Sequence, residues 1–407
     1  MPSTLPAGEP APSDGALPAA ALSELGDRPF GLYVHVPFCA VRCGYCDFNT
    51  YTATELGPDV SQATYPHAAI GELQLAARVL GASGAPSPVE TVFVGGGTPT
   101  LLPADDLVGV LAAVQRAFGL AALAEVTTEA NPDSVTPQSL QRLRDGGFTR
   151  VSYGMQSAVP HVLATLDRTH DPERVPQAVA WARAAGFDQI SLDLIHGTPG
   201  ESLADWRSTV EAALALDPDH ISAYSLIVEP GTALARKVRR REAPVPDDDQ
   251  AADSYELAEE LLGAAGYTWY ELSNWARTPA ARCRHNLGYW QGADWWGIGP
   301  GAHSHVGGVR WWNVKHPAAY AARLAAGRSP ALAREHLDRQ TRRTERVLLE
   351  TRLADGLDTG LLDQAGLAAV PGLVADGLVA RARLPERLVL TLRGRLLADA
   401  VVRRLLP

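Results

Sequence analysis

The chain has 407 residues, of which 46% are hydrophobic, and a formal net charge of −10 at pH 7. A chain of this length can bury a large core and is expected to form more than one domain. The negative charge argues against nucleic acid as the main partner, because binding a polyanion relies on basic residues that neutralise phosphates. No window offers the roughly 18 continuous apolar residues of a spanning helix. We therefore expect a soluble cytoplasmic protein, with peripheral membrane contact left open.

Residues 1–28 are rich in proline, alanine and small polar residues. This composition is typical of disordered segments, because it offers little apolar surface to bury. No basic segment leads into an apolar run, which argues against a secretion signal. The composition predicts a disordered leader over residues 1–28.

Six short β-rich segments alternate with Ala/Leu/Arg-rich stretches of helical character. This alternation predicts a parallel α/β sheet, within a domain that spans residues 29–230. Parallel α/β sheets and barrels carry their chemistry at the C-terminal ends of the strands, and the candidate residues of this chain follow or end these segments. The predicted strands are residues 31–36, 91–94, 125–129, 150–153, 189–194 and 220–226.

Three cysteines, Cys39, Cys43 and Cys46, follow the first predicted strand with the spacing C-x3-C-x2-C. Thiolates anchor iron–sulfur clusters, and a four-iron cubane normally takes four of them. Three cysteines would leave one iron without a protein ligand, and an open metal position is where a substrate or cofactor binds. The alternatives are a structural zinc completed by a distant histidine, and three buried small side chains. The only other cysteine is the distant Cys283, which argues against disulfides and for a reduced, intracellular chain.

Other polar residues also fall at predicted strand ends. A glycine-rich loop, GGGTPT at residues 95–100, follows the second strand, and glycines let a backbone approach a ligand closely. Glu129 ends the third strand, Gln156 follows the fourth and Asp193 ends the fifth. The guanidinium of Arg168 is a planar donor suited to a carboxylate. Each residue alone is typical of a structural hydrogen bond, but their convergence on one face predicts a single composite site.

The motifs in this half of the chain are similar to those of the radical S-adenosylmethionine (SAM) superfamily. GLYVHVPFCAVRCGYCDFN, FVGGGTPT, TEANP, YGMQS, LDRTHD and DLIHGTPGE resemble the subgroup that contains oxygen-independent coproporphyrinogen III oxidase and a related heme chaperone. The resemblance implies an α/β fold, a partial (β/α)6 TIM-like barrel, with a [4Fe–4S] cluster on the three cysteines and SAM on the open iron. It places SAM against Tyr33, Gly96, Gly97, Thr98, Glu129, Gln156, Arg168 and Asp193, and a second SAM against Tyr45 and Ile227.

Two features distinguish the branches of this subgroup. Position 48 is Phe where the oxidase has a fourth cysteine, which weakens the oxidase interpretation. The segment CRHNLGYW, residues 283–290, resembles the HNxxYW motif of the chaperone branch, which the oxidase lacks. Heme needs an apolar, aromatic-walled cleft and an axial ligand, and the resemblance points to His285 or Cys283, with His303 and His305 close in sequence. Without the resemblance, the same aromatic residues are more typical of a core.

The last part of the chain changes character twice. Residues 231–333 are irregular and aromatic, and seven of the nine tryptophans lie between Trp269 and Trp312. Residues 334–407 become helical and Leu/Arg-rich, and the alternating segment ERLVLTLRG predicts a small hairpin, which together give a separate winged-helix-like domain. Winged helices often bind DNA, but a fold does not determine a function. The arginines of residues 381–407 are more typical of a solvated face, with an acidic partner or anionic lipid as the alternative.

Three functions remain open after these steps. The first is a heme chaperone that carries the cluster and SAM and passes heme to acceptor apoproteins such as respiratory heme proteins, with a homodimer left open. The second is the oxidase, which decarboxylates coproporphyrinogen III in porphyrin biosynthesis through a 5′-deoxyadenosyl radical. The third is a radical SAM enzyme with another substrate. Heme uptake would favour the first and decarboxylation the second.

Overall fold

The computed structural model describes residues 7–56, 62–83 and 88–406. Its centre is a sheet of six consecutive parallel strands, which confirms the predicted α/β class. Every predicted strand is present. Five extend beyond the predicted bounds at one or both ends, and the sixth ends one residue earlier than predicted, at Ser225. The strands are β2 (Phe30–Val36), β3 (Val89–Gly96), β4 (Leu120–Ala130), β5 (Arg150–Gln156), β6 (Gln189–His196) and β7 (His220–Ser225).

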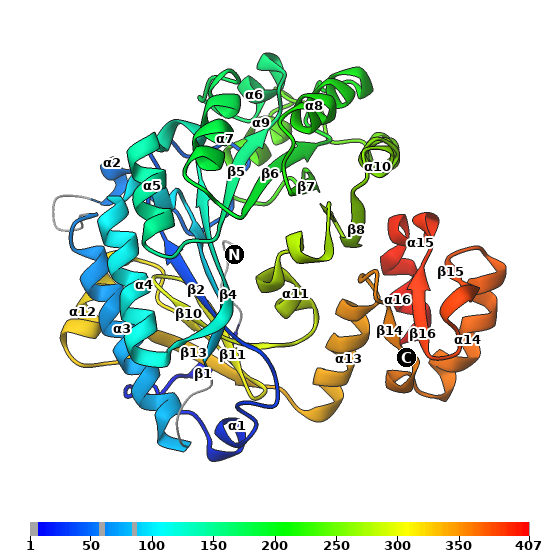
Figure 1. Ribbon diagram of the computed structural model, residues 1–407. Helices are drawn as coiled ribbons and strands as arrows, with labels where there is room; N and C mark the ends of the chain where they lie inside the picture. The colour runs from blue at the N-terminus through cyan, green and yellow to red at the C-terminus, as the bar shows by residue number, and fades with distance from the viewer. Residues whose placement is uncertain (1–6, 57–61, 84–87, 407) are drawn as a thin grey trace.

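Helices connect these strands and cover the outer face of the curved sheet (Figure 1). The side of each strand that faces these helices is largely apolar. β2 is almost wholly buried, and five of its seven residues are hydrophobic. The connecting helices are α2 (Ala53–Leu56), α3 (Tyr65–Leu80), α4 (Ala104–Phe118), α5 (Pro137–Asp145), α6 (Pro160–Thr165), α7 (Arg174–Ala184) and α8 (Leu203–Ala215).

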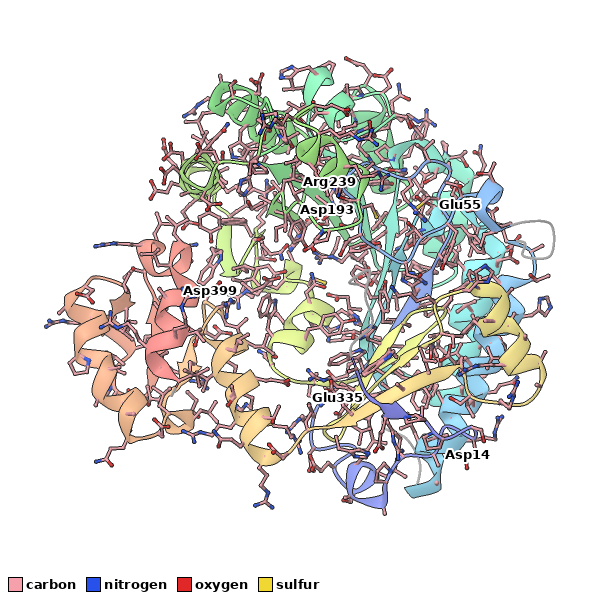
Figure 2. All side chains as sticks on the ribbon, turned by 180° about the vertical axis from the view of Figure 1, so that it is seen from behind. Asp14, Glu55, Asp193, Arg239, Glu335 and Asp399 are labelled. Atoms are coloured by element: carbon pink, nitrogen blue, oxygen red, sulfur yellow. The ribbon has the colours of Figure 1, made fainter. Side chains whose placement is uncertain are left out.

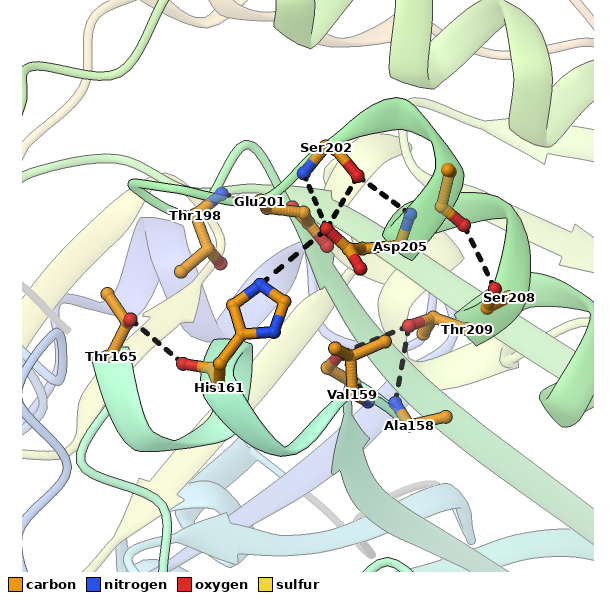
Figure 3. A network of polar contacts seen from close by, with 12 residues as sticks. Ala158, Val159, His161, Thr165, Thr198, Glu201, Ser202, Asp205, Ser208 and Thr209 are labelled. Carbon is orange, nitrogen blue, oxygen red and sulfur yellow. Dashed lines mark hydrogen bonds and ion pairs between the residues drawn. The ribbon is translucent and has the colours of Figure 1, made fainter.

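The start of α8 shows how local sequence sets these boundaries (Figure 3). Ser202 caps the helix, because its hydroxyl accepts a hydrogen bond from the Asp205 backbone N–H at 3.1 Å. The Asp205 carboxylate accepts in return from the Ser202 backbone N–H at 2.9 Å. This reciprocal pair is a capping box, which satisfies amide groups that the first helical turn leaves free. His161 of α6 lies 3.6 Å from Asp205 and ties the two helices together.

Residues 231–333, expected to be irregular, extend the sheet at both of its edges. At one edge β9 (Asn274–Ala276) pairs antiparallel with β7 and with β8 (Thr268–Glu271). At the other edge β10 (Asp294–Ile298) pairs parallel with β2. The antiparallel strands β11 (His303–Val306), β12 (Val309–Asn313) and β13 (Ala331–His336) follow it. The helices here are α9 (Ala233–Arg239), α10 (Asp248–Ala264), α11 (Arg284–Trp290) and α12 (Pro317–Ala325).

The leader differs from the prediction over its described part. Residues 7–28 are not a free segment: β1 (Glu9–Pro10) pairs with β13, where Glu9 lies opposite Arg334. The Arg334 guanidinium Nε donates to the Glu9 carboxylate at 2.7 Å. Helix α1 (Ala19–Ser23) buries Ala21 against the main core. Composition could not reveal this order, because its partners lie about 300 positions further along the chain. Residues 1–6 of the predicted leader lie outside the described residues.

The C-terminal part packs around an apolar cluster of its own, which includes Val347, Leu357, Leu388 and Leu405. It contains α13 (Arg339–Glu350), α14 (Gln364–Ala375), α15 (Leu392–Leu396) and α16 (Ala398–Leu405). A small sheet of β14 (Leu357–Asp358), β16 (Arg387–Leu390) and β15 (Val379–Ala380) completes it. The expected boundary at residue 334 falls inside β13. Within the described ranges, no helix is long and apolar enough to cross a membrane.

Candidate functional site

A cavity of about 490 Å³ lies inside the curved sheet, at the C-terminal ends of the parallel strands. Side chains that alternate along each strand point into it, as the period of two along a strand requires. Thirteen of the fifteen predicted site residues line this cavity. They are Cys39, Cys43, Tyr45, Cys46, Gly96, Gly97, Thr98, Glu129, Gln156, Arg168, Asp193, Ile227 and Cys283. The other two, Tyr33 and His285, do not line the cavity. Their rings lie next to each other, with centroids 6.4 Å apart.

The three clustered cysteines sit on a loop between β2 and α2 that the surrounding backbone holds in place. The Cys39 N–H donates to the Tyr51 carbonyl at 3.0 Å, and the Cys46 N–H donates to the Cys43 carbonyl at 3.2 Å. Between them, the Gly44 carbonyl accepts from the Leu234 N–H of α9 at 2.8 Å. All three thiols are free and half-buried. Burial raises the pKa of the Cys39 thiol to about 11, so a positive centre in the cavity would be needed to ionise it.

The residues fit a cluster held by one thiolate per iron. Among the described residues, no three Cys, His, Asp or Glu side chains converge closely enough to hold a single metal ion. A cubane does not need such convergence, because its thiolates bind different irons. The cavity between the thiols is kept open by Gly97, where a Cβ would lie 3.0 Å from the Cys39 sulfur.

The glycine-rich loop packs directly on the cysteine loop. The Gly97 N–H donates to the Val36 carbonyl at 2.8 Å, and the Thr98 N–H donates to the Phe38 carbonyl at 2.7 Å. Gly96 has a φ of +114°, a conformation that only glycine adopts without strain. Both glycines are therefore required by the backbone geometry that places this loop against Cys39.

Two half-buried carboxyl groups, those of Glu129 and Asp193, face the cavity with few partners. Burial, reinforced by the nearby Asp193, raises the pKa of Glu129 to about 8, although the Gly96 N–H donates to it at 2.9 Å. Burial also raises the pKa of Asp193, which accepts a 2.8 Å hydrogen bond from the Ser152 hydroxyl. Figure 2 labels Asp193 in the strand-and-helix half of the molecule. Both groups have oxygens left to accept hydrogen bonds from a ligand.

Arg168 contacts both the cysteine loop and the strand ends that surround the cavity. Its Nη1 lies 3.5 Å from the Cys43 sulfur, and its Nη2 donates to the Gly154 carbonyl at 2.7 Å. The same Nη2 donates to the Asn131 side-chain oxygen, a partner that sequence reasoning missed although it lies in the TEANP motif. Gln156 adopts a φ of +62°, which is uncommon for a residue other than glycine and is found most often at functional sites.

The two predicted heme ligands, Cys283 and His285, have different surroundings. Cys283 is buried, lines the cavity and lies with its sulfur 3.7 Å from Glu125 Oε1. His285 is hydrogen-bonded through both ring nitrogens, to the Thr91 hydroxyl at 2.9 Å and to the Tyr289 hydroxyl at 2.8 Å. It lines a smaller cavity of about 150 Å³, and burial lowers its pKa to about 3.

A carboxylate that the sequence did not single out holds this segment. Glu125 of β4 accepts from the backbone N–H groups of Arg284 at 3.0 Å and His285 at 3.1 Å. These are N–H groups of the first turn of α11, which have no partner within the helix. Glu125 therefore fixes α11 inside the curve of the sheet, where Figure 1 also shows it. His303 and His305, close in sequence, lie on β11 and do not line the cavity.

The fold and the cysteine-lined cavity define a radical SAM protein. The family model described as the radical SAM superfamily matches residues 33–213. Coproporphyrinogen III oxidase (HemN) from Escherichia coli shares the fold, with a TM-score of 0.80 over 97% of this chain and 94% of that chain, at 24% identity.

Curated relatives define the group more narrowly. The chain is 53% identical over 385 residues to heme chaperone HemW from Mycobacterium tuberculosis strain H37Rv, covering 95% of this chain and 97% of the relative. It is 38% identical over 278 residues to heme chaperone HemW from Escherichia coli, covering 68% and 70%. The chain belongs to the HemW family of radical SAM proteins.

Proposed function

We propose that this protein is a heme chaperone, which binds heme and passes it to acceptor apoproteins. The observation that carries this proposal is the 53% identity to a protein named heme chaperone HemW across 95% of the chain. That span includes the segment CRHNLGYW and most of the C-terminal part. The oxidase interpretation is not favoured, because the likeness to the oxidase is 24% identical and extends to the fold alone. Phe48, which stands where the oxidase has cysteine, is 45% exposed at the cavity.

We propose that Cys39, Cys43 and Cys46 hold a [4Fe–4S] cluster and that SAM binds beside it. When bound, the cluster supplies an iron with an open position and the capacity to transfer an electron. The chain contributes the pocket around it. Arg168 is placed to pair with the SAM carboxylate, because its guanidinium lies 3.5 Å from the Cys43 sulfur. Glu129 and Asp193 offer acceptors to the amino and ribose hydroxyl groups. The backbone at Gly96, Gly97 and Thr98, with Gln156, completes this site. Tyr33, also expected here, is not among the residues that line the cavity, and its hydroxyl is hydrogen-bonded to the His35 ring at 2.9 Å.

Within this proposal, the structure supports Cys283 over His285 as the group that reaches heme in the cavity. Cys283 lines the cavity, whereas His285 would first have to give up hydrogen bonds to Thr91 and Tyr289. Burial raises the pKa of the Cys283 thiol well above its usual range. Binding to iron would therefore release a proton. A second SAM at Tyr45 and Ile227 stays a prediction.

The test is an anaerobic hemin titration of cluster-reconstituted protein, followed by the Soret absorbance. We expect one heme per chain, with weaker binding in Cys283→Ala than in His285→Ala. His161→Ala is the matched control, because His161 lies on the outer helix α6 and contacts Asp205. An absence of heme binding by wild-type protein that carries its cluster would contradict the proposal.

The same proposal includes partners and location. Respiratory heme proteins are the expected acceptors and the cytoplasm is the expected location. A homodimer and peripheral membrane contact stay predictions. Sedimentation with and without lipid vesicles tests both of the latter.

A further inference from the structure

The part of the cavity nearer the N-terminal ends of the strands lies below the proposed SAM residues and is called here its lower level. It contains a buried guanidinium that is incompletely paired. Arg150 is the first residue of β5 and is 2% exposed. Its Nη1 donates to the Ala281 carbonyl at 2.8 Å. Its Nη2 is buried without a hydrogen-bond partner, and Arg150 forms no ion pair within 4.0 Å with any carboxylate of the described residues. A buried guanidinium N–H without an acceptor is unfavourable, so this atom calls for a ligand.

The neighbour of Arg150 on the next strand has the same property. Thr127 of β4 lies directly opposite Arg150 in the parallel register. Its hydroxyl is fully buried, and it too has no hydrogen-bond partner in the part of the chain that the structure describes. Both residues line the cavity. Two adjacent strands therefore aim an unpaired N–H and an unpaired hydroxyl into the same space.

The neighbouring side chains that the structure describes do not pair directly with this N–H. The Arg150 charge acts on the Asp193 carboxyl at a distance and opposes the rise of its pKa that burial causes, but Asp193 forms no ion pair with Arg150 and accepts from the Ser152 hydroxyl at 2.8 Å. His220 of β7 is tied through both ring nitrogens, to the Ser191 hydroxyl at 2.7 Å and to the Tyr270 hydroxyl at 2.8 Å. Burial holds its pKa well below the usual range, so it is neutral. Glu125 is occupied by the backbone of α11. The lower level thus offers donors and positive charge, which is the chemistry that recognises a carboxylate.

The position of this level connects it to the segment proposed to hold heme. Along β4, Glu129 is two residues beyond Thr127, so the SAM level lies about 7 Å above the Arg150 level. The Ala281 carbonyl that accepts from Arg150 is two residues before Cys283, which lines the same cavity. The SAM carboxylate belongs to the upper level, where Arg168 lies next to the cysteines. A carboxylate that pairs directly with the Arg150 Nη2 would therefore come from another molecule.

We propose that Arg150 and Thr127 form a carboxylate subsite that binds a propionate side chain of the heme cargo. This inference rests on the proposed function. Heme carries two propionates on one edge of an apolar macrocycle, so one propionate on Arg150 would orient the ring against the Cys283 segment. A free small carboxylate has the same chemistry and is the competing occupant.

The experiment compares hemin with its dimethyl ester, in which both propionates are blocked. Binding of each is measured anaerobically with wild type, Arg150→Met and Thr127→Val. Arg142→Met is the matched control, since Arg142 is an exposed partner of Asp105 on the outer helices. We expect Arg150→Met to weaken hemin binding by roughly tenfold or more, as loss of a charge-assisted hydrogen bond implies. Thr127→Val, the milder change, should weaken it a few-fold. Neither variant should change binding of the ester.

The ester separates binding from folding. Equal weakening of hemin and ester by Arg150→Met would show a structural role and overturn the inference, as would equal affinity of wild type for both ligands. Protection of wild type from thermal unfolding by sodium propionate, combined with equal affinity for hemin and ester, would assign the subsite to a free carboxylate and also overturn it. Wild type that binds neither porphyrin would instead refute the heme chaperone proposal itself.

Discussion

Replacing Gly97 by alanine is expected to prevent normal assembly of the proposed cluster. A Cβ at this position would lie 2.4 Å from the Phe38 carbonyl oxygen and 3.0 Å from the Cys39 sulfur. Ordinary van der Waals contacts begin at 3.4 Å, so the backbone that carries Cys39 must retreat by about 1 Å. Phe38 cannot retreat freely, because its carbonyl accepts from the Thr98 N–H at 2.7 Å. Such overpacking costs about 1–3 kcal/mol of stability, and a shift of this size exceeds the roughly 0.5 Å that a functional site tolerates.

The assay is anaerobic reconstitution with iron and sulfide, followed by metal analysis and urea unfolding. Gly109→Ala is the matched control, because a Cβ there meets nothing within 4 Å in the middle of α4. The control should carry a full cluster and gain about 0.5–1 kcal/mol. Gly97→Ala should carry less than about half of the wild-type iron, because displacement of the Cys39 thiolate weakens binding of the cluster. Wild-type iron content and stability in Gly97→Ala would show that the added Cβ is accommodated without displacing Cys39.

Three further changes test other parts of the structure. Burial raises the pKa of Glu72 to about 7, so the folded state holds a proton that the unfolded state releases. Stability should therefore fall as pH rises from about 4.5 to 7, by at most about 1.4 kcal/mol per pH unit. Glu72→Gln should flatten this dependence in urea unfolding, and parallel profiles would contradict the assignment. Glu125→Ala leaves two N–H groups of α11 unpaired and should cost roughly 3 kcal/mol, whereas a loss below about 1 kcal/mol would show that water replaces the carboxylate. Arg395 of α15 pairs with Glu259 of α10 at 2.8 Å and stacks on Trp269 at 4.3 Å. Arg395→Met should loosen the C-terminal part, seen as faster proteolysis of α14–α16, and an unchanged cleavage rate would argue against this contact.

The parallel strands and the cavity wall were predictable because their signals are local. The apolar segments that became β2 to β7 are short and bounded by helical stretches, and the topology of a parallel sheet then brings their ends together. This is why Cys39, Gly97, Glu129 and Asp193, spread over some 150 positions, line one cavity. The roles of these residues toward a cluster and SAM came from the resemblance and stay proposals.

What sequence reasoning missed depends on contacts between distant segments. The pairing of Glu9 with Arg334 and the placement of β10 beside β2 have no local signal. The tryptophans that suggested a heme cleft prove to be largely core, since Trp275, Trp296 and Trp312 are fully buried. Glu125 and Arg150 were overlooked because each belongs to a strand segment without a motif, and their partners come from residues more than 130 positions away.

Whether the protein delivers heme is decided by measuring transfer to an acceptor. Protein loaded with one heme per chain is mixed anaerobically with an excess of an apo-form of a respiratory heme protein, and the Soret spectrum is followed. For a heme chaperone we expect the acceptor to gain heme faster from the loaded wild type than from heme-loaded serum albumin, with loss of heme from the donor. Heme that stays on the loaded protein, or reaches the acceptor no faster than from albumin, would contradict the proposal.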